Sequence, residues 1–85
     1  MRSKALEAGV IINVPPEDQL TDNPFATLLR LVWKYAKVHR QMYNRWLNGQ
    51  PVSCWYDVFG NICIEYESGV WWHYKVTKQD GLEWW

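Results

Sequence analysis

The longest periodic pattern of hydrophobic residues lies in residues 24–48. At about 100° per residue, its apolar side chains fall on one broad face: Phe25, Leu28, Leu29, Val32, Tyr35, Ala36, Met42, Tyr43, Trp46 and Leu47. Asn23 is placed to cap backbone N–H groups at the start, and Pro24 suits the first helical position. Gly49 can adopt the left-handed conformation that ends a helix, and Pro51 prevents its continuation. The sequence therefore predicts one long helix with one buried face.

After Pro51 the spacing of apolar residues changes from helical to alternating, which is typical of β-strands. Strands are predicted at residues 52–58, 62–66 and 70–76, with a short fourth segment at 82–85. Glycine-containing turns separate these segments, so the simplest topology is a sequential antiparallel meander. The expected fold class is α+β, with one long helix packed on a small sheet of three to four antiparallel strands.

Residues 1–23 are predicted to form an N-terminal arm, and residues 24–85 a single domain. The arm contains Pro15-Pro16, and its main apolar stretch is residues 10–14. This stretch either adds an edge strand to the sheet, lies across the helix, closes over the other sheet face or remains a partly ordered terminus. The sequence does not choose among these positions.

The turns also predict which side chains share a face of the sheet. Three-residue loops at 59–61 and 67–69 place Tyr56 opposite Ile64, and Ile64 opposite Trp72. The face of even-numbered residues then becomes the floor for the helix. On the opposite, outer face, one row contains Trp55, Glu65 and Trp71, and the next contains Asp57, Cys63 and His73.

One helix can cover only one face of such a sheet, so the outer face is expected to hold partly exposed tryptophans unless the arm covers them. Exposed tryptophans are costly in water and are enriched at interface hot spots. We therefore expect Trp55, Glu65, Trp71 and His73 to form part of a partner-binding surface. The terminal Trp85 either packs on the sheet edge or protrudes as a further anchor.

The charged residues balance over the whole chain but are unevenly distributed along it. The nine acidic and nine basic side chains cancel, so no global field attracts nucleic acid or an anionic membrane. Four cations lie opposite the buried face of the predicted helix: Arg30, Lys34, Lys37 and Arg45. This basic stripe is either a solvated face or a contact for an acidic partner. In the alternative function, a nucleic-acid-binding accessory protein, the stripe contacts phosphates while exposed tryptophans stack on bases.

Asp57, Cys63 and His73 are the residue types of an orienting carboxylate, a thiol nucleophile and a base. A flat sheet lacks an oxyanion pocket, so we do not expect an enzyme. These residues also lack a recognisable metal-ligand spacing, so neither a metal nor another cofactor is expected. Cys54 and Cys63 fall on opposite faces and should not form a disulfide. His39 lies within the apolar helix face and is expected to be a hydrogen-bonded core residue.

The stretch Tyr-Asp-Val-Phe-Gly-Asn at residues 56–61 is followed by Gly69, Trp71 and Tyr74. These features, within residues 56–74, resemble the tyrosine-aspartate (YD-type) repeat of bacterial and phage-encoded proteins. The resemblance implies a β-hairpin unit with the glycine-asparagine pair in its turn. It also implies a phage or mobile-element setting.

Size and composition complete the expectations. A chain of 85 residues buries only a modest core, and seven Trp, five Tyr and two Phe are expected to compensate. Two cysteines fit a reducing cytoplasm, and no stretch is apolar enough to span a membrane. The expected function is a small non-catalytic protein-binding module that inhibits a larger protein or complex, as phage anti-defence (anti-CRISPR-like) and toxin-neutralising immunity proteins do. A homodimer is a further alternative.

Overall fold

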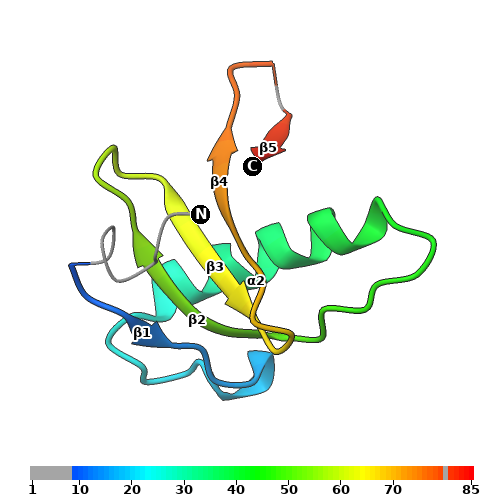
Figure 1. The fold of residues 1–85 in the computed structure, drawn as a ribbon. Helices are drawn as coiled ribbons and strands as arrows, with labels where there is room; N and C mark the ends of the chain where they lie inside the picture. The colour runs from blue at the N-terminus through cyan, green and yellow to red at the C-terminus, as the bar shows by residue number, and fades with distance from the viewer. Residues whose placement is uncertain (1–8, 80) are drawn as a thin grey trace.

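A computed structural model describes residues 9–79 and 81–85 of the chain. Within these residues, five strands form one antiparallel sheet whose spatial order follows the sequence. The strands are β1 (Ile12–Asn13), β2 (Pro51–Tyr56), β3 (Ile62–Tyr66), β4 (Trp71–Val76) and β5 (Leu82–Trp84). A short 3-10 turn, η1 (Glu17–Gln19), precedes the helix α2 (Ala26–Gln41), which crosses one face of the sheet (Figure 1). The predicted α+β class is confirmed, with five strands instead of three to four.

The additional strand comes from the predicted N-terminal arm, of which residues 1–8 lie outside the described residues. Ile12 and Asn13 pair antiparallel with β2. The side chains of Ile12 and Val14 pack against the core beneath the helix. Residues 12–14 therefore extend the sheet at one edge, which is one of the positions that the sequence left open.

The helix begins at Ala26, two residues after the predicted first helical position Pro24, and its N-cap residue is Phe25 and not Asn23. The side-chain oxygen of Asn23 accepts a hydrogen bond from the backbone N–H of Phe25 at 2.8 Å. The buried positions along the helix recur at the expected spacing of three to four residues: Leu29, Val32, Ala36 and His39. Phe25, at the very start, is 46% exposed, so its predicted burial was wrong.

The helix ends at Gln41, well before the predicted end at Asn48. The backbone N–H groups of Met42 and Tyr43 reach the carbonyl oxygens three residues back, at 3.1 and 3.2 Å. Such bonds tighten the last turn and end the α-helical ladder. Gly49, the predicted stop, does have a positive φ of 76°, but it lies in the loop that follows the helix.

Of the remaining apolar residues predicted to lie on the helix, some pack inward and others are exposed to solvent. Trp46 turns inward, where its Nε1 donates to the Gly49 carbonyl at 2.7 Å and its ring centroid lies 5.1 Å from that of Tyr66. Met42 and Leu47 are 70% and 73% exposed, so their predicted burial was wrong. Helical periodicity assigns residues to a face only while the helix continues.

The hairpin of β3 and β4 has the predicted register. Its three-residue turn ends at Gly69, which adopts the left-handed conformation with φ of 90°. Ile64 lies opposite Trp72, as expected. A glycine at the last position of the turn thus sets the alignment of the two strands.

The hairpin of β2 and β3 follows the same rule and differs from the prediction for that reason. Its turn is residues 58–60, closed by the Asp57 N–H bond to the Asn61 carbonyl at 2.9 Å. Gly60 therefore takes the last position, with φ of 84°, whereas the predicted turn placed it in the middle. Tyr56 consequently lies opposite Ile62 and not opposite Ile64. The register moves by an even number of residues, so every side chain keeps its predicted face.

A substitution at Gly60 tests this account of the turn. An added Cβ would meet no atom within 4 Å, so the cost of Gly60→Ala comes from the left-handed backbone alone. We expect the free energy of unfolding to fall by about 1 kcal/mol. Urea denaturation checks this, with Gly60→Asn as the control because asparagine tolerates this conformation better. An unchanged midpoint for Gly60→Ala would contradict the left-handed assignment.

His39 lies at the centre of an aromatic core between the helix and the sheet. Its side chain is fully buried, and Nδ1 lies 2.7 Å from the Tyr74 hydroxyl, which in turn lies 2.6 Å from the Tyr66 hydroxyl. The Trp84 ring stacks on the imidazole with a centroid distance of 4.2 Å. Burial lowers the pKa of His39 from 6.5 to about 4, so the imidazole is neutral near pH 7. The expectation of a hydrogen-bonded core histidine is confirmed.

Candidate functional site

The outer face of the sheet brings together side chains that the sequence placed in neighbouring rows. Because of the shifted β2–β3 register, Trp55 lies opposite Cys63, and Cys63 lies opposite His73. Asp57 follows the last residue of β2, where it begins the turn. Its carboxylate nevertheless reaches His73, at 3.0 Å between Oδ2 and Nδ1, because both side chains project from the same face.

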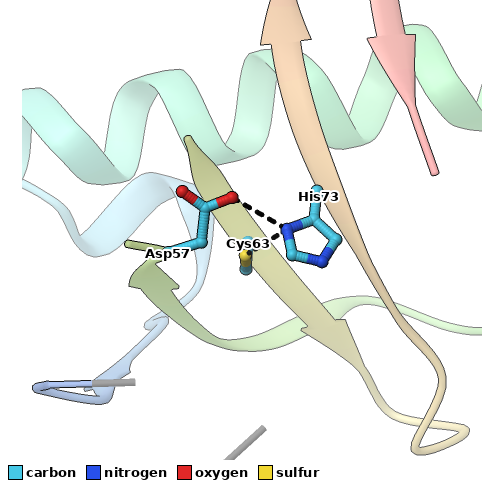
Figure 2. Close-up of side chains that lie close together, drawn as sticks. All are labelled: Asp57, Cys63 and His73. Carbon is cyan, nitrogen blue, oxygen red and sulfur yellow. Dashed lines mark hydrogen bonds and ion pairs between the residues drawn. The ribbon is translucent and has the colours of Figure 1, made fainter. Parts of the chain in front are cut away.

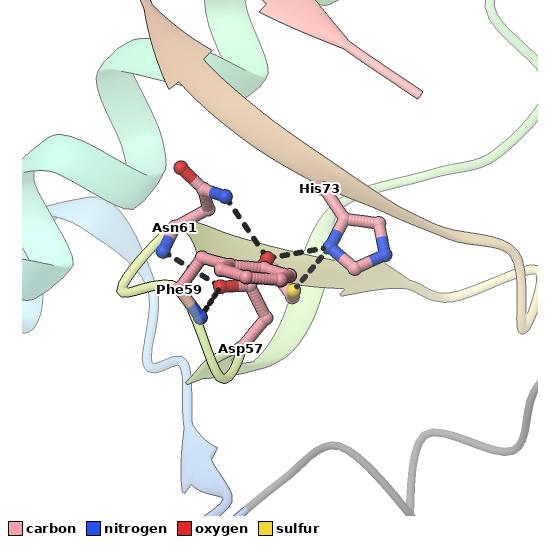
Figure 3. A network of polar contacts seen from close by, with 5 residues as sticks. Asp57, Phe59, Asn61 and His73 are labelled. Carbon is pink, nitrogen blue, oxygen red and sulfur yellow. Dashed lines mark hydrogen bonds and ion pairs between the residues drawn. The ribbon is translucent and has the colours of Figure 1, made fainter.

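The Asp57 carboxylate organises the turn that it precedes (Figure 3). Its Oδ1 accepts hydrogen bonds from the backbone N–H groups of Phe59 and Asn61, at 2.8 and 2.9 Å. Its Oδ2 accepts a bond from the side-chain amide of Asn61 at 3.1 Å, in addition to its contact with His73. An aspartate that bonds to the backbone two residues ahead is a common way to hold a turn. Asp57 thus fixes the backbone of residues 58–61.

The carboxylate remains ionised despite its burial. Desolvation alone would raise the pKa of Asp57, which is 7% exposed. The hydrogen bonds from Asn61, His73 and Phe59 outweigh this effect and hold the pKa below its ordinary value of 3.8. The turn is therefore held by a charged acceptor, whose hydrogen bonds are stronger than those of a neutral one.

Cys63, His73 and Asp57 meet at a single imidazole nitrogen (Figure 2). Nδ1 of His73 lies 3.3 Å from the Cys63 sulfur and 3.0 Å from the Asp57 carboxylate. A catalytic base that is oriented by a carboxylate uses its two ring nitrogens for the two tasks, one for the nucleophile and one for the carboxylate. Here both groups contact the same nitrogen, so the cluster does not have the geometry of a nucleophile, base and orienting carboxylate.

The two cysteines lie on opposite faces of the sheet, as expected, and they do not form a disulfide. Cys54 belongs to the core beneath the helix, where burial raises the pKa of its thiol to about 11. A thiol with so high a pKa is a poor nucleophile near neutral pH. Any thiol chemistry of this protein would therefore belong to Cys63.

The predicted partner-binding surface is largely closed. Trp55 is 1% exposed and His73 is 6% exposed, so the expectation of an exposed Trp55 was wrong. Trp71 is half-buried and packs against Trp55, with 5.2 Å between ring centroids. Glu65 is also half-buried, and it accepts a hydrogen bond from the Ser53 hydroxyl at 2.8 Å. The structure places these four predicted residues side by side on one face, but it presents little of their surface.

Trp85 occupies an intermediate position between the two alternatives left open for it. Its ring stacks on His73 with a centroid distance of 5.0 Å and an interplanar angle of 5°. The backbone groups of Trp85 and His73 also exchange two hydrogen bonds, at 3.0 and 3.2 Å. The residue is nevertheless 50% exposed, because only one side of its ring is covered by His73. Trp85 therefore both packs on the sheet and presents apolar surface.

The basic stripe is present only in part. Arg30, Lys34 and Lys37 are exposed on α2, and Lys37 forms an ion pair with Glu17. Arg45 is exposed as well, but it lies beyond the end of the helix. It is therefore not aligned with the others by helical periodicity, which corrects the predicted four-residue stripe.

The most exposed aromatic side chain lies at a place that the sequence analysis did not select. Phe59 is 85% exposed and its neighbour Val58 is 76% exposed, both in the turn that Asp57 holds. We call these two residues the apolar tip. Val58 was predicted to face the helix, but it lies in the turn beyond the end of β2 and has no core to enter. The available signal was Phe59 itself, an aromatic residue in a predicted loop with polar and glycine neighbours.

An apolar groove lies where β1 and β2 meet the start of α2. It is about 320 Å³ in volume and is lined by residues of β1, β2 and the start of α2: Ile12, Pro24, Phe25, Thr27, Leu28, Leu31 and Tyr56. Tyr56, which is 50% exposed, stands two residues before Val58 along the chain.

Comparison of the chain with protein-family models, curated proteins and solved structures gave no match. In the part of the chain that the structure describes, no helix has the length and apolar character needed to cross a membrane. The functional interpretation therefore rests on the geometry above.

Proposed function

We propose that this protein is a small non-catalytic protein-binding module that inserts its apolar tip, Val58 and Phe59, into a pocket of a larger protein. The observation that carries this proposal is the 85% exposure of Phe59 on a turn held by the buried Asp57 carboxylate. Aromatic side chains in apolar pockets supply much of the binding energy at protein interfaces. Because the turn is already ordered, little backbone entropy is lost when the partner binds.

The surroundings of the tip support a protein partner. The groove lined by Tyr56 offers a second apolar surface, and Tyr56 is two residues before Val58 in the sequence. Exposed apolar surface of this kind is unfavourable in water and is typical of interaction sites. An inhibitor of a larger protein needs only one such interface, which suits a domain of 85 residues.

The geometry of the outer face supports a function without catalysis. The Cys63 sulfur and the Asp57 carboxylate both contact Nδ1 of His73, so the imidazole cannot relay a proton from one to the other through its two nitrogens. His73 is also covered by the stacked ring of Trp85. In this proposal the cluster holds the turn and does not act on a substrate.

The tip can be tested with a matched pair of substitutions. Phe59→Ala removes the proposed anchor, and Leu47→Ala removes a side chain of similar exposure, 73%, from a different loop. We expect Phe59→Ala to weaken the partner complex by about 2 kcal/mol or more, roughly thirtyfold in Kd. Leu47→Ala should leave Kd unchanged. The complex is isolated from host lysate with the tagged full-length chain, and Kd is then measured by calorimetry with the purified partner.

Three results would contradict the proposal. Equal loss of binding in both variants would show that no single anchor lies at the tip. Recovery of nucleic acid that is lost at high salt would favour the basic residues of α2 instead. A homo-oligomer with no other protein, unaffected by Phe59→Ala, would favour self-assembly through another surface.

A further inference from the structure

We infer that Asp57, Cys63 and His73 form a binding site for one zinc ion that links the strands β2, β3 and β4. The carboxylate oxygen, the sulfur and the imidazole nitrogen all lie within 4.8 Å of one another. The residues are far apart in the sequence, at positions 57, 63 and 73, so their spacing along the chain gave no metal-ligand motif. The antiparallel register brings them together, and this inference does not depend on the proposed partner.

The distances between the ligand atoms suit a tetrahedral ion after small adjustments. Zinc lies at about 2.0–2.2 Å from nitrogen and oxygen ligands and about 2.3 Å from sulfur, which separates neighbouring ligands by about 3.3–3.8 Å. Nδ1 of His73 lies 3.0 Å from the Asp57 oxygen and 3.3 Å from the Cys63 sulfur. These two pairs would have to separate by a few tenths of an ångström, and the Cys63 sulfur and the Asp57 oxygen already lie within 4.8 Å of each other. Side-chain rotation can supply such movements. The fourth position would be filled by water.

The convergence on one nitrogen, which does not suit catalysis, suits a metal. In the ion-free protein, Nδ1 of His73 carries the proton that it donates to the Asp57 carboxylate. Metal binding would shift this proton to Nε2, and the Nδ1 lone pair would then point to where the other two ligands also lie (Figure 2). A thiolate and a carboxylate together carry two negative charges, and the imidazole is neutral. A divalent ion would make the cluster electrically neutral, which lowers the cost of placing it among residues that are 7% exposed or less.

Hydrogen bonds from the turn hold one of the three ligands, Asp57, in place. Both backbone bonds of the turn go to Oδ1 of Asp57, while Oδ2 accepts the Asn61 side-chain amide and faces the cluster (Figure 3). Outer contacts of this kind orient metal ligands and raise metal affinity. Among the described side chains, the half-exposed ring of Trp85 lies over His73. Rotation of this side chain would admit the ion.

Binding would proceed by exchange of a proton for the metal, without oxidation or reduction. The S–H bond of Cys63 breaks, a sulfur–zinc bond forms, and one proton is released to the buffer. The carboxylate of Asp57 is already ionised. The proton that Nδ1 of His73 donates to this carboxylate moves to Nε2, so the imidazole contributes its Nδ1 lone pair with no net loss of a proton. Because one proton is released, zinc binding should strengthen as the pH rises.

Cobalt(II) is the probe, because a cobalt–thiolate bond gives a charge-transfer band in the near ultraviolet. We expect the reduced full-length chain to bind one cobalt ion with this band and with the intense visible bands of tetrahedral cobalt. Equimolar zinc should then remove both. Cys63→Ser should abolish the charge-transfer band. Cys54→Ala is the matched control, because it removes the other buried cysteine from the opposite face and should leave the band intact.

Asp57→Asn keeps the proposal testable if Cys63→Ser does not fold. Asparagine can still accept the backbone bonds of the turn, but it is a much weaker metal ligand. Cobalt affinity should therefore fall by at least the roughly tenfold to hundredfold that is typical of losing only an outer contact to a ligand. Circular dichroism confirms the fold of each variant before titration. A reduced wild-type chain without the charge-transfer band would overturn the site, as would a band that survives in Cys63→Ser or disappears in Cys54→Ala.

Discussion

Asp57→Ala is expected to lower the free energy of unfolding by about 3 kcal/mol, because it removes the acceptor of several hydrogen bonds at once. The N–H groups of Phe59 and Asn61 lose their partner, and the contact with the buried His73 is lost as well. The loss is large for a turn residue because the acceptor is ionised and 7% exposed. Urea denaturation followed by circular dichroism measures it.

Asp57→Asn is the control for the same position. Asparagine retains an oxygen that can accept the two backbone bonds, and it loses only the charge. We expect a cost of about 1 kcal/mol for this variant, well below that of Asp57→Ala. Equal losses for the two variants would show that charge alone matters at this site. Negligible losses for both would contradict the role of Asp57 in holding the turn.

Acidification from pH 7 to pH 4 is expected to cost about 3 kcal/mol of stability through His39. Its pKa is lowered from 6.5 to about 4 by burial, so the unfolded chain takes up a proton before the folded protein does. The contribution of the neutral imidazole is complete above pH 6.5 and is lost as the pH falls from there toward 4. Urea denaturation at a series of pH values between 7 and 4 measures how steeply the free energy of unfolding falls with pH.

His39→Gln separates this effect from other acid effects. The variant loses the imidazole that contacts Tyr74 and will be less stable at every pH, but its stability should fall less steeply between pH 6.5 and 4. Asp57, whose pKa is lowered, contributes below this window, because its stabilisation is lost only as the pH falls below its ordinary value of 3.8. A slope that is unchanged in His39→Gln would contradict the assignment to His39.

The sequence predicted the faces of the sheet better than its register. Alternation has a period of two, so the wrong turn at Gly60 moved Tyr56 from Ile64 to Ile62 without exchanging the faces. The outer position of Asp57, Cys63 and His73 was predicted for this reason. The convergence of Asp57 and Cys63 on one nitrogen of His73 was not predicted, because it depends on the side-chain rotamers and on the position of Asp57 in the turn.

Two failures have a common physical origin. The end of the helix was placed too late because Met42, Trp46 and Leu47 continue the apolar period after the backbone has stopped being helical. The burial of Trp55 was missed because alternation assigns a side chain to a face but does not say what else packs there. Local periodicity describes each element by itself. Exposure is a property of the assembled fold.

The exposed tip was missed because the search for a partner-binding site followed the tryptophans. Tryptophan is enriched at hot spots, but in a domain of this size most of the large aromatic side chains are needed in the core. Trp55 is buried, and Trp46 and Trp84 pack around His39. Phe59, in a turn held by Asp57, has no such role in the core. It is therefore the aromatic residue whose exposure calls for a functional explanation.

Site-specific photo-crosslinking at position 59 tests the central claim most directly. A photoreactive phenylalanine analogue replaces Phe59 in one variant and Leu47 in a second, and the crosslinked products from host lysate are identified by mass spectrometry. The account predicts one crosslinked protein partner from position 59 and none from position 47. No product from position 59, or the same products from both positions, would contradict a partner-binding role for the apolar tip.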